Sequence, residues 1–352
     1  MSTLEEALSM RNCLSEYHVY HGSGQNVSIT PFINKKMEFG YNKRRQSHRE
    51  EAEVYEASQR QANEANSYFL HQPKHLFSNP PRLLRRGSDK DGEPICLIYS
   101  APFWDHWNVQ FKDNLNEIVD PRGMIPFENR SRRDNSIKGD GCAWKGYKVR
   151  SWRVWGESGK AYHQRINARR KMREEEGHKV IPAFEPLSAD EAIKLSWSFP
   201  FVRPRRYEFQ YAGINFTWKG TRDLPVDEKF AKVLLPLNHL KLIATDTKGN
   251  RYFIAFYSSA FNPEKYGRLW VFDNMISNLL EQSGGSQMND YLQNAEEGSA
   301  SRQESDIRRT RIYELVMATS MCMVLGEWEK RATLYLMLLM LVIAGRNAVI
   351  AS

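Results

Sequence analysis

RRYEFQYAGINFTWKGT, residues 205 to 221, contains two alternating runs of large apolar residues that meet at a glycine. Those residues occupy odd positions before Ala212-Gly213 and even positions after it: Tyr207, Phe209 and Tyr211, then Ile214, Phe216 and Trp218. Side chains of a strand alternate with a period of two, so a turn or bulge between antiparallel strands produces this change of parity. The stretch therefore predicts a β-hairpin.

Further strand patterns lie on both sides of this hairpin. HLKLIATDTKGNRYFIAFYSS, residues 239 to 259, predicts a second hairpin that turns at Lys248-Gly249-Asn250, and GRLWVFDNM after it predicts another strand. PICLIYSAPFWDHWNVQF, residues 94 to 111, is a buried apolar run followed by aromatic residues. These patterns do not alternate with helices, which argues against a parallel α/β sheet and predicts a mainly β, antiparallel fold.

The segment RVWGESGKAYHQR, residues 153 to 165, resembles part of a phosphate-binding loop. That loop requires a glycine separated by four residues from the Gly-Lys pair, and a hydroxyl residue after the pair. Val154 and Ala161 occupy those two positions, so the nucleotide hypothesis fails. The alternating residues before the segment favour a hairpin that turns at Gly156-Glu157-Ser158-Gly159.

The last 41 residues, from Ile312 to Ser352, contain no proline and are apolar around almost the whole helix circumference. Their longest uncharged run, residues 332 to 345, has 14 residues and covers about 21 Å as a helix. Spanning a bilayer requires roughly 20 residues, so this run is too short. We therefore predict a hydrophobic core helix. A C-terminal membrane anchor stays open as an alternative.

Composition predicts one domain with polar extensions. Residues 1 to 75 are polar and poor in aliphatic residues, which predicts a largely disordered tail. The folded domain is expected at residues 94 to 345, with polar insertions at about 168–180 and 282–310.

The chain has a net charge of +8 among 352 residues, which indicates anionic partners. Residues 122 to 179 alone hold 16 Lys or Arg and 7 Asp or Glu, a local excess of +9. The four cysteines lack the spacing of a zinc site or a disulfide framework, and we predict free thiols and no metal. The acidic N-terminal sequence MSTLEEALSM does not match a secretory signal, which predicts an intracellular protein in the cytoplasm or the nucleus.

Several motifs resemble a family of fungal proteins whose fold is similar to the tubby C-terminal domain and to the LURP-one and phospholipid-scramblase-like proteins. They are FWDHWNV, IVDPRGMI, SWRVWGESGKAYHQR, LSADEAIKLSW, YEFQYAGINFTWKGT, HLKLIA and VMATSMCMVLGEWEKR. The resemblance covers residues 94 to 345 without the two insertions. It implies an antiparallel barrel wrapped around a hydrophobic C-terminal helix, and phosphoinositide binding through basic residues on the barrel surface. It transfers no functional residue to a position in this chain.

Basic residues of two segments are candidates for binding an anionic headgroup: Lys145, Lys148, Arg150, Arg153 and Lys160, with Arg203, Arg205 and Arg206. Basic side chains that alternate along a strand project to one face and can hold a phosphate by charge-assisted hydrogen bonds. The alternative is that they form an ordinary solvated exterior of the sheet.

No catalytic constellation accompanies these residues. Asp105-His106 and His163 lack a nucleophile or metal-ligand spacing, and Asp120-Pro121-Arg122-Gly123 has the composition of a turn. Nucleic-acid binding has only the charge in its favour, because no zinc-finger or RNP-type motif is present. We predict a non-enzymatic binding module without cofactor for anionic phospholipid, with peripheral membrane association. A protein scaffold without lipid binding is the other alternative.

Overall fold

The computed structural model describes residues 14–22, 26–34, 66–73, 80–100, 106–125, 156–175, 189–198, 206–220, 239–259, 265–283 and 307–351. The strands of this part of the chain are β1 (Leu14–His21), β2 (Val27–Thr30), β3 (Tyr68–His71), β4 (Arg82–Arg86), β5 (Glu93–Ser100), β6 (His106–Phe111), β7 (Glu191–Ser198), β8 (Arg206–Tyr211), β9 (Ile214–Gly220), β10 (His239–Thr245), β11 (Arg251–Ser259) and β12 (Lys265–Phe272). The helices are α4 (Leu115–Ile118), α5 (Gly156–Glu175), α7 (Asp273–Ser283) and α10 (Arg311–Ala351).

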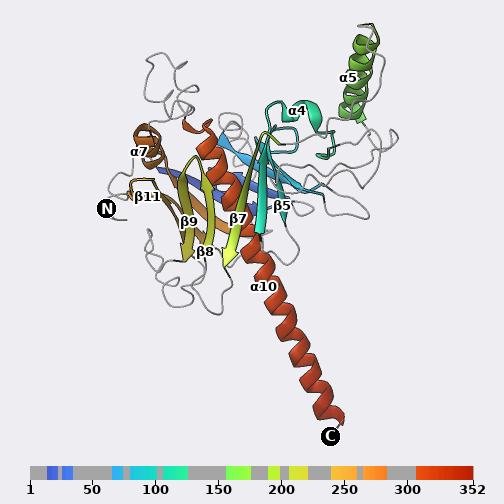
Figure 1. The fold of residues 1–352 in the computed structure, drawn as a ribbon. Helices are drawn as coiled ribbons and strands as arrows, with labels where there is room; N and C mark the ends of the chain where they lie inside the picture. Colours follow the sequence, from blue (N-terminus) through green and yellow to red (C-terminus); the bar gives the residue numbers. More distant parts are fainter. Residues whose placement is uncertain are drawn as a thin grey trace, which may run out of the picture.

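The strands form one closed antiparallel barrel (Figure 1). Each strand pairs with its neighbours in the sequence, and β1 pairs with β12 to close the barrel. Closure leaves no open sheet edge, and sequence-adjacent pairing is the commonest connection between antiparallel strands. The predicted antiparallel barrel, within a mainly β fold, is confirmed.

The hairpin that the parity change predicted is confirmed as β8 and β9. Tyr211 pairs with Ile214, and the two residues between them have positive φ angles of 49° and 78°. Two successive positive φ angles are typical of the turn that matches the right-handed twist of a two-residue hairpin. The large residues on both strands face the core: Tyr207, Phe209, Ile214, Phe216 and Trp218 are buried.

The second predicted hairpin is also confirmed, as β10 and β11. Gly249 has a φ angle of 85°, and the Asp246 carboxylate accepts hydrogen bonds from the backbone N–H and the side-chain amide of Asn250. A carboxylate that binds the backbone of its own turn stabilises that turn. The strand predicted after it corresponds to β12.

The predicted start of the folded domain at residue 94 is wrong. β1, β2 and β3 lie within the first 75 residues and belong to the barrel, and β4 also precedes residue 94. These are short strands in which buried residues such as Tyr17, Val19 and Val27 are embedded in polar sequence. Averaging the composition over the whole tract concealed them. The residues of this tract between 35 and 65 lie outside the described part.

The predicted hairpin at residues 156 to 159 is also wrong, because the segment begins α5. The alternation that suggested strands lies in residues 147 to 155, which are outside the described part of the chain. From Gly156 onward, no proline interrupts a run of residues that favour helices, and Glu157 in the first turn suits the helix dipole. Helix propensity therefore outweighs the turn composition of this tetrapeptide. The predicted insertion at about 168–180 overlaps the end of α5, and most of the insertion at 282–310 lies outside the described residues.

The hydrophobic C-terminal helix is α10, and it has two distinct halves. Nearly every residue from Ile312 to Glu327 is buried. This half contacts strands from different parts of the barrel: Tyr313 bonds to Tyr17 of β1 at 2.8 Å, Trp218 of β9 donates to Thr319 at 3.5 Å, and further contacts involve β5, β6 and β12. The second half of α10 continues past the strands and projects from the barrel (Figure 1).

Candidate functional site

Three consecutive residues, 327 to 329, hold α10 where it leaves the barrel. We call the end of the barrel at these residues the exit end. Glu327 accepts a hydrogen bond from the hydroxyl of Tyr207 on β8. Trp328 makes edge contacts with His21 and Tyr266, at ring-centroid distances of 5.6 and 6.0 Å. Because neighbouring helix residues point about 100° apart, these side chains hold the helix against different walls.

Glu329 completes the contacts at the exit end. Its carboxylate lies 3.1 Å from the guanidinium of Arg82 on β4, and the Arg82 guanidinium stacks over the ring of Trp107. Both charged side chains are largely buried, at 13% and 20% exposure. Partial burial strengthens such a pair relative to one in bulk water, so it helps to fix the helix register.

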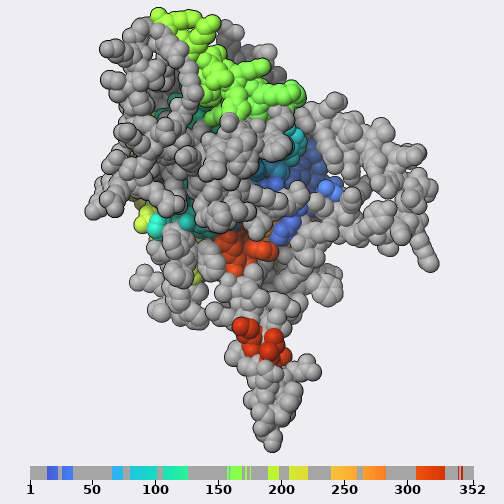
Figure 2. All heavy atoms as spheres, turned by 90° about the vertical axis from the view of Figure 1, so that its right-hand side faces the viewer, coloured from blue at the N-terminus to red at the C-terminus, as the bar shows by residue number. Residues whose placement is uncertain are grey.

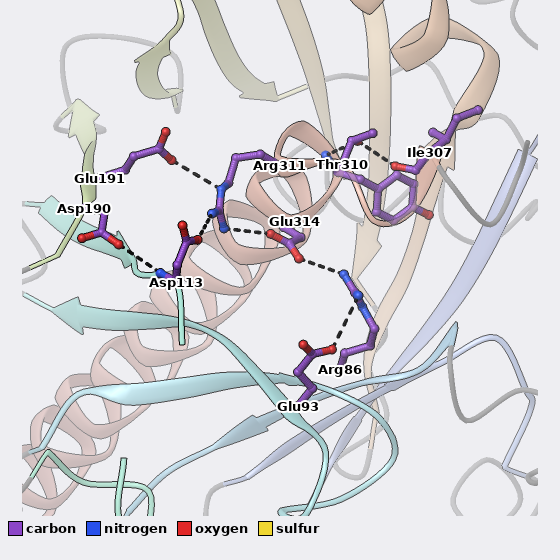
Figure 3. A network of polar contacts seen from close by, with 10 residues as sticks. Arg86, Glu93, Asp113, Asp190, Glu191, Ile307, Thr310, Arg311 and Glu314 are labelled. Atoms are coloured by element: carbon purple, nitrogen blue, oxygen red, sulfur yellow. Dashed lines mark hydrogen bonds and ion pairs between the residues drawn. The ribbon is translucent and has the colours of Figure 1, made fainter. Parts of the chain in front are cut away.

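The other end of α10 is held by a network of ion pairs (Figure 3). Arg311 lies 3.0 Å from Glu314 and 3.4 Å from Glu191, and Glu314 in turn lies 2.8 Å from Arg86 of β4. Burial raises the pKa of Glu314, while both arginines act in the opposite direction. The buried half of α10 is thus fixed to strands at both of its ends. The length of α10 that projects from the barrel is therefore also fixed.

A row of basic residues crosses three adjacent strands on the outer face of the barrel. Arg206 of β8 pairs with Lys219 of β9, and Lys219 pairs with Lys241 of β10. Each of them follows or precedes a residue that faces the core, such as Tyr207 or Trp218, so all three point outward. We call Arg206, Lys219 and Lys241 the basic row.

The basic row places three like charges side by side. Like charges directly opposite each other on neighbouring strands destabilise a sheet, and this arrangement repeats across two strand pairs. Glu208 forms an ion pair with Arg206, but both side chains are about half exposed, at 51% and 53%. An exposed pair of this kind contributes little to stability.

The basic row lies toward the exit end of the barrel. Arg206 directly precedes Tyr207, whose hydroxyl binds Glu327 of α10. β7 and β9 also finish at this end, and their arrowheads point the same way as the C-terminal half of α10 (Figure 1). The positive charge and the projecting helix thus share one end of the molecule.

The structure describes two of the eight predicted anion-binding residues, and it does not bring those two together. Arg206 belongs to the basic row, whereas Lys160 lies on α5, which stands at the opposite end of the barrel from the projecting half of α10 (Figure 1). Lys160 is 71% exposed and pairs with Glu157 at 2.7 Å. The other six predicted residues lie outside the described part: Lys145, Lys148, Arg150, Arg153, Arg203 and Arg205.

Sequence reasoning missed Lys219 and Lys241. Each is a single lysine inside a strand, and only the register of three strands aligns them with Arg206. The sequence did contain one signal for these two lysines, their odd positions in strands whose core residues are at even positions. Both lie on the face opposite the aromatic residues of the predicted hairpins, which marks them as outward-facing but not as neighbours.

The structure describes contacts for two of the motifs considered for catalysis. Asp120 is fully buried and accepts hydrogen bonds from the backbone N–H groups of Arg122 and Met124, as the predicted turn requires. His163 makes an edge contact with Tyr162 on α5. Among the described residues, no group of three or more His, Cys, Asp or Glu is arranged to hold a metal ion.

Comparisons with protein-family models, with curated proteins and with solved structures find no match. In the described part of the chain, no helix combines the length and the apolar character that crossing a membrane requires.

Proposed function

We propose that this chain is a non-enzymatic binding module that attaches to anionic phospholipid surfaces through the exit end of its barrel. The observation that carries the proposal is the basic row, three cations aligned on adjacent strands. Neighbouring strands lie about 4.8 Å apart, so the row spans roughly 10 Å, which suits a headgroup that carries more than one phosphate. Phosphate oxygens accept charge-assisted hydrogen bonds from arginine and lysine.

The surroundings of the row support a lipid surface rather than a small soluble anion. Trp328 at the exit end is 45% exposed and contacts His21 of β1 and Tyr266 of β12. Tryptophan is enriched where proteins meet the headgroup region of a bilayer. In the sequence, Lys330 and Arg331 follow Glu329, so this stretch of the chain contains two more basic residues. A basic surface near the membrane is attracted to anionic lipid by about 1 kcal/mol per Lys or Arg.

The proposal is tested by flotation of the full chain with three kinds of vesicle: phosphatidylcholine alone, phosphatidylcholine with phosphatidylserine, and phosphatidylcholine with a phosphoinositide at matched total charge. We expect flotation only with the anionic vesicles, and weaker flotation as salt rises from low to physiological concentration, about 0.15 M. Stronger binding to the phosphoinositide at equal charge would identify a multivalent headgroup site. Equal flotation with all three vesicles, or none, would reject the proposal.

A further inference from the structure

The projecting half of α10 exposes large apolar side chains. Met340, Val342 and Ile343 are 69%, 61% and 47% exposed. Figure 2 shows described atoms of this segment, in red, on the part of α10 that stands clear of the barrel. They belong to the uncharged run of residues 332 to 345. Exposed apolar surface of this kind on a protein marks an interaction site.

The arrangement of these residues around the helix selects the partner. At about 100° per residue, Val342 lies roughly 200° from Met340 and 100° from Ile343. The three exposed side chains thus cover an arc of about 160°, wider than the roughly 100° stripe of a helix that packs against one partner. A helix that docks into a groove of another protein presents one apolar face, whereas acyl chains contact a helix from every side. The observation favours lipid.

The length of the uncharged run limits how deep the helix goes. Its 14 residues cover about 21 Å, more than the roughly 15 Å of one leaflet and less than the roughly 30 Å of the whole hydrocarbon core. Arg346 follows directly, and a charged residue near the bilayer centre is costly. The run is thus suited to lie strongly tilted within one leaflet, so that Arg346 stays within reach of the headgroups, and not to cross.

We infer that residues 332 to 345 of α10 insert into the leaflet that faces the exit end, with Trp328 at the headgroup level. This inference rests on the proposed function for its orientation, and it adds a hydrophobic contact to the electrostatic one. The contacts of Glu327 and Glu329 with the strands hold the helix, so insertion also fixes the distance between barrel and membrane.

The test places a nitroxide label at position 340 of the full chain. The label is attached to Met340→Cys in a chain whose Cys13 and Cys142 are replaced by Ser, while the buried Cys96 and Cys322 are kept. The matched control carries the label at Met172→Cys on α5, because Met172 is 61% exposed and lies at the opposite end. Collisions with oxygen, which enriches in acyl chains, are compared with collisions with a water-soluble nickel complex. The vesicles contain phosphatidylcholine and phosphatidylserine.

On the vesicles, we expect the accessibility of the label at 340 to the nickel complex to fall at least tenfold and its accessibility to oxygen to rise. The label at 172 should keep the accessibilities that it has in solution. A label at 340 that stays in water on vesicle-bound protein would overturn the inference and leave the proposed function standing. Conversely, a label that enters the lipid in a chain whose binding ignores the charge of the vesicle would reject the proposed function alone.

A second variant tests the same inference without a label. Met340→Asp, Val342→Asp and Ile343→Asp together place charge on three side chains that are exposed, so the barrel is expected to fold. We expect the triple variant to retain salt-sensitive flotation and to lose the fraction that resists high salt. Unchanged salt-resistant flotation would contradict insertion.

Discussion

Neutralising the basic row gives the most informative mutational test. The variant Arg206→Gln, Lys219→Gln and Lys241→Gln removes three outward charges and leaves the core residues of β8, β9 and β10 in place. At about 1 kcal/mol for each basic residue near an anionic surface, the loss is about 3 kcal/mol, or roughly 150-fold in Kd. Glu208 loses its partner, but that pair is about half exposed and its loss costs little.

The matched control removes the same number of charges from α5: Lys160→Gln, Arg165→Gln and Lys171→Gln. Lys160 and Lys171 are 71% and 78% exposed, and α5 stands at the other end of the barrel. Titration with vesicles at low salt, with thermal unfolding to verify that both variants fold, gives the two dissociation constants. We expect the α5 variant to bind within a few-fold of the unmodified chain. Equal losses in both variants would mean that net charge, and not the basic row, drives binding, which would refute the reasoning.

Three further predictions concern stability and reactivity. Burial lowers the pKa of His71 to about 4. Between pH 6.5 and 4 the unfolded chain binds a proton at this residue and the folded chain does not, so the free energy of unfolding falls as the pH drops through this range. Urea denaturation of His71→Gln should therefore show a flatter pH dependence there. Gly213→Ala should lower the free energy of unfolding by about 1 kcal/mol because φ is 78°, and a smaller loss for Gly213→Asn, a residue that tolerates this φ, would attribute the effect to the backbone. Burial raises the pKa of Cys96 and Cys322, so both thiols should resist alkylation until the chain unfolds, as peptide mapping by mass spectrometry can check; rapid native labelling of either would contradict their placement.

The parts of the fold that could be predicted from the sequence are local. The hairpin around Gly213 and the hairpin around Gly249 each carry their turn residues and their alternating core face within about 20 positions. Barrel closure depends instead on β1 pairing with β12, more than 200 residues apart, and no local pattern encodes that pairing. β1 was overlooked because its core residues, such as Tyr17 and Val19, are surrounded by polar sequence.

Sequence patterns did not reveal the basic row, for a different reason. The density of positive charge between residues 122 and 179 drew attention to that segment, yet the basic row is assembled from three strands that are each poor in charge. Lys219 and Lys241 become neighbours of Arg206 only through strand register. α5 shows the converse error, because a Gly-Glu-Ser-Gly sequence that is compatible with a turn also begins a helix when helix-forming residues follow. The residues that follow such a tetrapeptide decide whether it forms a turn or begins a helix.

Footprinting of lysines on the unmodified chain tests the central claim most directly. Acetylation rates of individual lysines are measured by mass spectrometry, with and without vesicles of phosphatidylcholine and phosphatidylserine. The account predicts that Lys219 and Lys241 react more slowly on the vesicles, while Lys160 and Lys171 on α5 react at unchanged rates. Protection of the α5 lysines with no change at Lys219 and Lys241 would contradict it, because the membrane would then face the wrong end of the barrel.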